Sequence, residues 1–245
     1  MPGLTDTPKV HVFSIVWNEE YMLPYFLRHY STFADTIFII NDHSTDKTAK
    51  IAKAHPKSQL LDFPYNRGLN EDDFSDCFAD FYKQYSRGVA DWVMCVDADE
   101  LIYNADILGV LKQQRQRGVQ VLKTTGYQMV AETPPTTIGQ IYEECKVGGR
   151  SRGFDKPVVF DPELNITFGN GRHSVQVPEG IHVGRARLLL LHYKYLSRDF
   201  YINRSNIVYP RTSGMTDEII GYRLKRALKW YDHVMQAPSE LERVV

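Results

Sequence analysis

Residues 91–101, DWVMCVDADEL, join a short apolar stretch to a group of carboxylates. The apolar part, residues 92–96, has the length and composition of a buried strand. Asp97 and Asp99 follow where that strand would become a loop, so both carboxylates can turn toward one cation. Hard divalent ions such as Mg²⁺ and Mn²⁺ prefer oxygen ligands of this kind. The stretch therefore predicts a buried strand with a metal-binding loop at its end, although an isolated Asp-x-Asp is also typical of a solvated acidic loop.

Three further strand signals precede this stretch, and helix signals separate them. We predict strands at residues 9–16, 36–40 and 59–63, and helices at residues 20–30, from Ser44 to just before Pro56, and at 72–85. Strands that alternate with helices predict an α/β fold with a doubly wound, mostly parallel sheet covered on both faces. Ligands of such sheets bind at the carboxyl ends of the strands. The loops that follow the four strands are therefore where a site is expected.

The pattern changes after about residue 125, where prolines and glycines separate short β runs. This favours an irregular, partly antiparallel second half, with a strong strand at residues 185–191. A helical pattern returns over residues 216–236 and stops before a proline. We therefore expect a single domain over residues 1–215, followed by a C-terminal helical tail over residues 216–245.

The composition excludes some classes of function. The formal net charge of the 245 residues is −1, which gives no reason to expect a nucleic-acid partner. No apolar run approaches the roughly 20 residues that span a bilayer, and residues 1–10 lack the pattern of a secretory signal. The three cysteines are scattered and form no CxxC pair, which favours buried free thiols in a reducing compartment. We therefore expect a cytoplasmic protein.

Two of the other loops carry side chains suited to a nucleotide. Trp17, Asn18 and Glu19 follow the first strand, where Trp17 could lie along a nucleobase and the backbone could meet its polar edge. Alternatively, Trp17 is a core residue and the acidic residues open a helix. Asp42 follows the second strand, and its carboxylate could accept a hydrogen bond from the N3–H of uracil or thymine, or from ribose.

The second loop also has the features of a helix start, since Ser44 would cap the next helix and Asp46 would favour its positive end. Both roles can hold together because they use different residues. Arg67 follows the third strand, and it could reach a phosphate through charge-assisted hydrogen bonds or be an exposed turn residue. All four loops follow consecutive strands and should converge on one edge of the sheet. That convergence is a stronger indication than any single motif.

At these positions the sequence resembles the GT-A-fold glycosyltransferases, and within them the family 2-like enzymes. The matching segments are VFSIVWNEEYMLPYFLRHY (residues 12–30), IFIINDHSTDKTAKIA (37–52) and DWVMCVDADEL (91–101). In that superfamily they correspond to the nucleotide-binding first strand, the D-x-S-x-D turn and the Asp-x-Asp metal motif. By this resemblance Asp42 contacts the base, while Asp97 and Asp99 grip the metal and the donor diphosphate.

The resemblance covers roughly residues 9–125, which would form the nucleotide-sugar-binding half, and leaves about 126–215 as the acceptor-side half. It implies a metal-dependent glycosyltransferase of the hexosyltransferase type that uses Mn²⁺ or Mg²⁺. The donor would be a nucleotide-sugar, commonly a UDP-sugar. The acceptor would be a glycan or a lipid-linked molecule in a polysaccharide pathway.

The second half departs from the pattern of that family. Many inverting members carry a Glu-Asp pair on a helix there, whose aspartate is the base, and this sequence has only the adjacent Glu143 and Glu144. An inverting reaction needs a carboxylate beside the acceptor hydroxyl, and Asp155 and Glu144 are the candidates, whereas a retaining reaction needs no such base. Lys156 lies in a basic cluster that could hold the donor diphosphate or an anionic acceptor, or be a solvated loop.

His192 is predicted to be a third protein ligand of the metal, or a phosphate donor beside it. It ends the apolar run at residues 188–191, so it should leave the core at a strand terminus, as Asp97 does. Mn²⁺ accepts nitrogen more readily than Mg²⁺ does, and some GT-A enzymes use a histidine in this way. His173 competes for the role, and either histidine could instead be an ordinary hydrogen-bonded residue at a strand end.

The tail is predicted to contain an amphipathic helix over residues 221–236. Its apolar residues recur at helical spacing, at Leu224, Leu228, Tyr231 and Met235. Its basic residues flank this apolar stripe, at Arg223, Lys225, Arg226 and Lys229. Packing on the catalytic domain is the favoured role. The other role is a peripheral contact with an anionic membrane, at the inner face where a lipid-linked acceptor would lie.

Other interpretations of the motifs fit less well. A nucleotidyltransferase usually has a glycine-rich phosphate loop after the first strand, and no glycine follows here. An aspartyl-phosphate phosphatase carries its Asp-x-Asp on the first strand, and a dinucleotide-binding oxidoreductase needs Gly-x-Gly-x-x-Gly. A domain that binds nucleotide-sugars or glycans without turnover stays open as an alternative. Such a domain would bind the donor with neither transfer nor hydrolysis.

Overall fold

The computed structural model describes residues 7–66, 70–169, 175–212 and 214–245. Its centre is a parallel sheet of four strands in the order β4-β1-β2-β3, with bounds β1 (Val10–Val16), β2 (Thr36–Asn41), β3 (Ser58–Asp62) and β4 (Trp92–Cys95). Every residue of β1 and β4 is buried, as expected for strands that are covered on both faces. The parallel arrangement predicted for the first half is confirmed.

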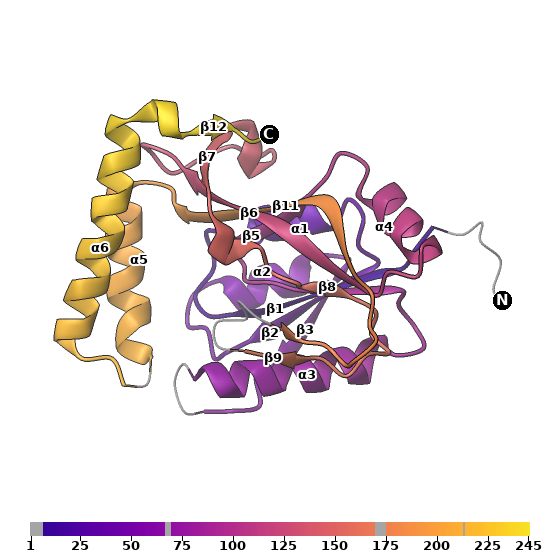
Figure 1. Cartoon of the computed structure of the whole chain (residues 1–245). Helices are drawn as coiled ribbons and strands as arrows, with labels where there is room; N and C mark the ends of the chain where they lie inside the picture. Colours follow the sequence, from indigo (N-terminus) through magenta and orange to yellow (C-terminus); the bar gives the residue numbers. More distant parts are fainter. Residues whose placement is uncertain (1–6, 67–69, 170–174, 213) are drawn as a thin grey trace.

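Helices cover both faces of this sheet (Figure 1). They are α1 (Leu23–Tyr30), α2 (Thr48–Ala54), α3 (Glu71–Ser86) and α4 (Ile107–Gln116). Successive residues of β1 point to opposite faces, so Val12 belongs to the same core cluster as Phe26 of α1. Phe13 belongs to the cluster that contains Phe78 of α3. One apolar core on each face therefore holds the sheet between the helices.

The second half of the chain extends the same sheet with mostly antiparallel pairings. Its strands are β5 (Glu100–Tyr103), β6 (Val121–Val130), β7 (Val147–Arg150), β8 (Val159–Phe160), β11 (Val183–Tyr195) and β12 (Glu242–Arg243). β8 joins the two halves, because it pairs antiparallel with both β4 and β6. β11 runs parallel to β6 and antiparallel to β5. The irregular, partly antiparallel half predicted from the sequence is confirmed.

The C-terminal segment forms a helical layer beside the sheet. α5 (Arg198–Val208) and α6 (Asp217–Gln236) lie side by side (Figure 1), and the 3₁₀ turn η4 (Tyr209–Arg211) follows α5. Tyr231 and Val234 of α6 cluster with Val130 of β6, and the Tyr231 hydroxyl donates to the Ala131 carbonyl at 2.7 Å. The chain then passes through η5 (Pro238–Glu240) into β12, which pairs with β7. α6 is thus the helix predicted for the tail, and it packs on the main sheet.

The remaining short elements are the 3₁₀ turns η1 (Ile141–Glu143) and η2 (Arg152–Phe154), and a separate antiparallel pair of β9 (Thr167–Phe168) and β10 (Val175–Gln176). All three cysteines are buried free thiols, as their scatter predicts. Within the described residues, no helix has both the length and the apolar character that crossing a bilayer requires.

Two helices begin later than the sequence predicts. α1 begins at Leu23 rather than at residue 20, and the backbone N–H groups of Glu19 and Glu20 donate to the side chains of Thr48 and Asp46. α2 begins at Thr48, so the prediction that Ser44 caps this helix is wrong. The Ser44 hydroxyl instead accepts from the Asn18 N–H at 3.0 Å. These contacts tie the loop after β1 to the loop after β2.

Candidate active site

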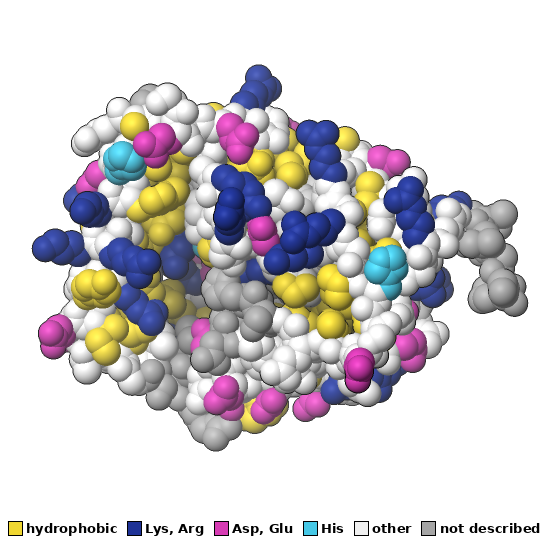
Figure 2. Space-filling view, viewed as in Figure 1, with side chains coloured by type: hydrophobic (Ala, Val, Ile, Leu, Met, Phe, Trp, Pro, Cys, Tyr) yellow, Lys and Arg dark blue, Asp and Glu magenta, His cyan; other side chains and the backbone are white. Residues whose placement is uncertain are grey.

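A cleft of about 440 Å³ lies between the loops after β1 and β4 on one side and α5, η4 and α6 on the other. The charged residues that line it are Glu19, Glu71, Asp97, Asp99, Lys156, Lys194, Arg204, Arg211 and Arg223. In Figure 2 the hollow beside the helical layer is bordered by basic side chains. The cleft therefore lies at the carboxyl ends of the parallel strands, where the sequence places the site.

Asp99 and His192 face each other within this cleft. Asp99 Oδ2 lies 3.3 Å from His192 Nε2, and His192 Nδ1 lies 2.8 Å from Gln128 Oε1. The register of the sheet brings His192 to these partners. On β11 it lies opposite Gln128 of β6 and opposite Glu100 of β5, the residue after Asp99. β11 continues to Tyr195, so His192 lies inside a strand and not at the strand terminus that its apolar run predicts.

The charge of Asp99 is set by its surroundings. Burial alone would raise the pKa of its carboxyl group, but His192, Lys194 and Arg204 hold that pKa well below its ordinary value. Asp99 therefore stays ionised at physiological pH and presents an anionic oxygen to the cleft.

The pair of Asp99 and His192 has the chemistry of a metal site. In a neutral imidazole whose Nδ1–H donates to Gln128 Oε1, the Nε2 lone pair would be available to a cation that the Asp99 carboxylate also binds. An imidazole nitrogen together with carboxylate oxygens suits Mn²⁺. Asp97 lines the same cleft, but no three His, Cys, Asp or Glu residues in the described part of the chain are placed to hold a metal alone. The residues thus fit a metal ion whose other ligands come from a bound phosphate and water.

A buried ion pair supports the turn at residues 97–99. Lys156 Nζ lies 2.5 Å from Glu100 Oε1, and the two side chains are 2% and 1% exposed. The other oxygen, Glu100 Oε2, accepts from the Asp97 N–H at 3.3 Å. Lys156 lines the cleft as predicted, yet its ammonium neutralises Glu100 rather than standing free for a donor phosphate.

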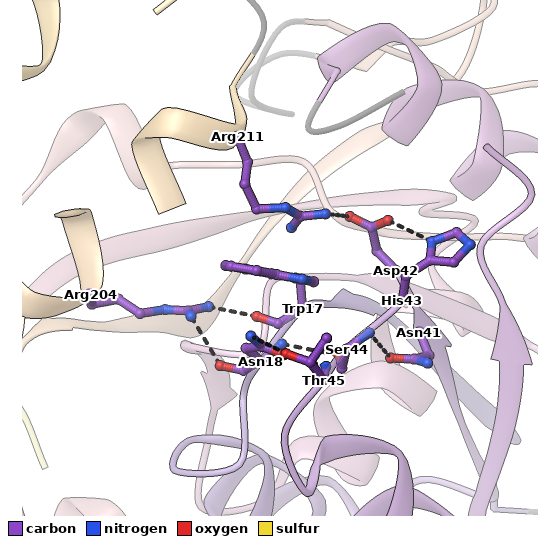
Figure 3. Close-up of polar contacts among 9 residues, drawn as sticks. All are labelled: Trp17, Asn18, Asn41, Asp42, His43, Ser44, Thr45, Arg204 and Arg211. Atoms are coloured by element: carbon purple, nitrogen blue, oxygen red, sulfur yellow. Dashed lines mark hydrogen bonds and ion pairs between the residues drawn. The ribbon is translucent and has the colours of Figure 1, made fainter. Parts of the chain in front are cut away.

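The loop after β1 is clamped by Arg204 of α5. Its guanidinium donates to the carbonyl oxygens of Trp17 at 2.9 Å and of Asn18 at 3.0 Å (Figure 3), and it forms an ion pair with Glu19. Asn18 has a left-handed backbone with φ of 50°, and its side-chain oxygen accepts from the Thr45 N–H at 2.7 Å. The loops after β1 and β2 are thereby fixed to each other and to α5.

Glu19 titrates in an unusual range for a carboxyl group. Burial raises the pKa of Glu19 to about 7, Arg204 opposes that rise, and the charges of Asp99 and Asp97 add to it. In the metal-free protein Glu19 therefore exchanges its proton near neutral pH.

Asp42 lies beneath a second arginine, Arg211 of η4. Asp42 is 3% exposed, its Oδ2 accepts from Arg211 Nη2 at 2.9 Å, and its Oδ1 lies 3.3 Å from His43 Nδ1. The guanidinium carbon of Arg211 lies 3.8 Å from the centre of the Trp17 ring. Trp17 and Asp42, the two residues expected to hold a nucleobase, therefore meet at one place (Figure 3).

The two candidate bases, Asp155 and Glu144, do not line this cleft. Asp155 accepts from Arg150 Nη2 at 2.7 Å and from the Gly126 N–H at 2.9 Å. Burial would raise the pKa of Asp155, but these two partners hold it below its usual value. Glu144 is exposed, accepts from the Thr136 N–H at 3.1 Å and lines a different cavity of about 410 Å³. Neither carboxylate is among the residues that line the Asp99 cleft.

The cleft brings together most of the predicted site. The predicted residues that line it are Trp17, Asn18, Glu19, Asp97, Asp99, Lys156 and His192. Arg67 and His173 lie outside the described residues. The basic residues of the cleft that were not predicted to be site residues are Lys194, Arg204, Arg211 and Arg223. Lys194 could have been placed here from the sequence, because it follows His192 by two residues and so shares its face of β11.

Comparisons with known proteins find distant likenesses of structure only. No protein-family model matches this chain, and no curated protein matches its sequence. Among solved structures, glucosyl-3-phosphoglycerate synthase from Mycobacterium tuberculosis in complex with Mn²⁺, uridine diphosphate and glucosyl-3-phosphoglycerate is 16% identical, with a TM-score of 0.38 over 49% of this chain and 44% of that one. TarS from S. aureus is 14% identical, with a TM-score of 0.47 over 82% of this chain and 39% of that one.

The matched regions span less than half the length of either neighbour. The fold of this chain is an α/β fold with a sheet whose central strands are parallel, followed by a C-terminal helix. Any activity has to be argued from the residues of the cleft.

Proposed function

We propose that this protein is a metal-dependent glycosyltransferase that takes a sugar from a nucleotide-diphosphate donor, such as a UDP-sugar, and passes it to a glycan or lipid-linked acceptor. The observation that carries the proposal is the facing pair of Asp99 and His192 in a cleft with a basic opposite wall. A nucleotide-sugar has the matching parts, since it joins a planar base to a diphosphate that binds divalent metal.

At the diphosphate end of such a donor, Asp97, Asp99 and His192 would hold Mn²⁺ or Mg²⁺. Bound there, the metal supplies positive charge against the diphosphate that leaves as the sugar–oxygen bond breaks. Lys194 and Arg223 line the same cleft and add positive charge of the protein's own. Lys194 is half-buried, so its attraction for the leaving group is stronger than that of a fully solvated charge.

At the base end, Trp17 offers an aromatic ring for stacking and Asp42 offers a carboxylate for a ring N–H. Both positions are rigid, because Arg204 holds the Trp17 carbonyl and the Asp42 N–H donates to the Val16 carbonyl at 2.9 Å. Contacts at this end lie away from the bond that breaks, so they contribute binding that is equal in the ground and transition states.

The test is incubation with a panel of nucleotide-sugars and Mn²⁺ or Mg²⁺, with release of nucleoside diphosphate as the signal. We expect release from one donor class, and loss of release when a chelator removes the metal. Including and omitting glycan acceptors separates transfer from hydrolysis by water.

Two results would contradict this proposal. Donor binding without any release would identify a non-catalytic nucleotide-sugar-binding domain. Release of pyrophosphate from a nucleoside triphosphate in the presence of a sugar phosphate would identify a nucleotidyltransferase.

A further inference from the structure

Arg211 fills the space that the base of the proposed donor needs. Its guanidinium carbon lies 3.8 Å from the centre of the Trp17 ring, and its Nη2 donates to Asp42 Oδ2 at 2.9 Å (Figure 3). A base stacked on Trp17 would lie about 3.5–4.0 Å from the ring. A base and the guanidinium therefore cannot occupy this position at the same time.

The guanidinium also resembles a base in its chemistry. It is planar, it stacks on aromatic rings and it presents N–H donors in its own plane. Uracil, thymine and guanine are planar rings with an N–H donor at the edge. A carboxylate that accepts from a guanidinium over Trp17 can accept from such a ring N–H instead.

The two sides of this contact differ in how firmly they are held. Trp17 and Asp42 are fixed through their backbones by Arg204 and Val16. Arg211 ends the three-residue turn η4, and its Nη1 is buried without a hydrogen-bond partner in the described part of the chain. An unsatisfied buried donor weakens the contact that Arg211 makes. Arg204, by comparison, bonds two backbone carbonyls and Glu19.

The geometry points to Arg211 as a specificity-determining residue that occupies the base subsite, so that a nucleotide binds there only when its base replaces the guanidinium on both Trp17 and Asp42. This inference rests on the proposed function, because it places the donor base between those two residues. The replaceable guanidinium selects against bases that present no ring N–H to Asp42, since Asp42 Oδ2 would then lose the donor that Arg211 gives it in the plane above Trp17.

Calorimetric titration with uridine and guanosine tests the inference. Nucleosides carry no phosphate, so their affinity reports on the base subsite without the attraction of Arg211 for a diphosphate. We expect Arg211→Ala to bind one of these nucleosides on the order of tenfold more tightly than the parent, because the competitor is gone. Arg211→Gln keeps an N–H donor for Asp42, so its gain in nucleoside affinity should be smaller than that of Arg211→Ala. If the alanine variant does not fold, the affinity of the glutamine variant tests the inference instead.

Arg226→Ala is the matched control, since it removes an exposed arginine of the helical layer that does not line the cleft. Its nucleoside affinity should equal that of the parent. Weaker or unchanged nucleoside binding by both Arg211 variants would overturn the inference. Turnover of a nucleotide-sugar by the parent protein is measured separately. Turnover by the parent would support the proposed function even if the Arg211 variants overturn this inference.

Discussion

Single side chains in the cleft are held by partners from distant parts of the chain. Arg204 lies 186 residues from Asn18 in sequence, and Arg211 lies 169 residues from Asp42. Each arginine joins a loop of the parallel sheet to the helical layer. A change in either residue therefore acts on the position of a loop as well as on the charge of the cleft.

Glu19 gives the free energy of unfolding a pH dependence. Its pKa is raised from 4.5 to about 7 in the folded protein, so its contribution to stability is complete below pH 4.5 and is lost as pH rises through 7. Glu19→Gln should remove this loss, which amounts to at most about 3 kcal/mol. Urea unfolding of both proteins in metal-free buffer from pH 4.5 to 7.5 measures it. The same pH dependence in parent and variant would contradict the assignment.

Lys156 is expected to matter for folding through Glu100. In Lys156→Met the carboxylate of Glu100 would be buried without its cation, which costs about 3–5 kcal/mol. The double variant Glu100→Gln with Lys156→Met leaves no unpaired charge and should recover most of that loss. Chemical denaturation of the parent, of Lys156→Met and of the double variant measures the free energy of unfolding of each. A single variant within about 1 kcal/mol of the parent would show that the pair does not support the turn.

Positions directly after strands were predictable, and positions on the helical layer were not. Trp17, Asp97 and Asp99 could be placed because the end of a parallel strand fixes the edge of the sheet on which the next residues lie. Arg204 and Arg211 reach the cleft only because their segment folds back over the loops. No local pattern in the sequence records such a contact.

Helices and strands whose apolar residues recur at a regular spacing could be predicted from the sequence, and the shortest elements could not. α6 runs from Asp217 to Gln236, close to the predicted residues 216–236, because its apolar residues recur at helical spacing. β8, β9, β10 and β12 have two residues each, and so short a strand carries no alternation that a sequence pattern could show. α5 buries only Tyr201 and Ser205, which leaves it without an apolar stripe.

The outer face of α6 retains the features of a membrane-surface helix. Ile219 and Tyr222 are 40% and 65% exposed, and the exposed Arg226 and Lys229 continue the same stripe. We predict sedimentation with vesicles that contain anionic lipid, and weaker sedimentation at high salt. Arg226→Glu with Lys229→Glu should abolish it, since each basic residue near an anionic surface adds about 1 kcal/mol. Equal recovery with neutral and anionic vesicles would leave α6 with packing as its only role.

The molecule as a whole is organised around the edge where its two halves join. β11 pairs with β5 and β6, and it carries His192 to the turn that follows β4. α5 and η4 then close the opposite side of the cleft. The donor site of this account therefore needs both halves and the helical layer, so a fragment of residues 9–125 should hold no metal-dependent donor affinity.

Release of nucleoside diphosphate, measured against Mn²⁺ concentration, decides whether Asp99 and His192 form the metal site. The account predicts that Asp99→Asn loses turnover on the order of 10²-fold or more, as other electrostatic stabilisers do. It predicts that His192→Ala needs a higher Mn²⁺ concentration for half-maximal turnover while its unfolding transition stays cooperative. Near-normal turnover by Asp99→Asn at limiting Mn²⁺ would contradict it.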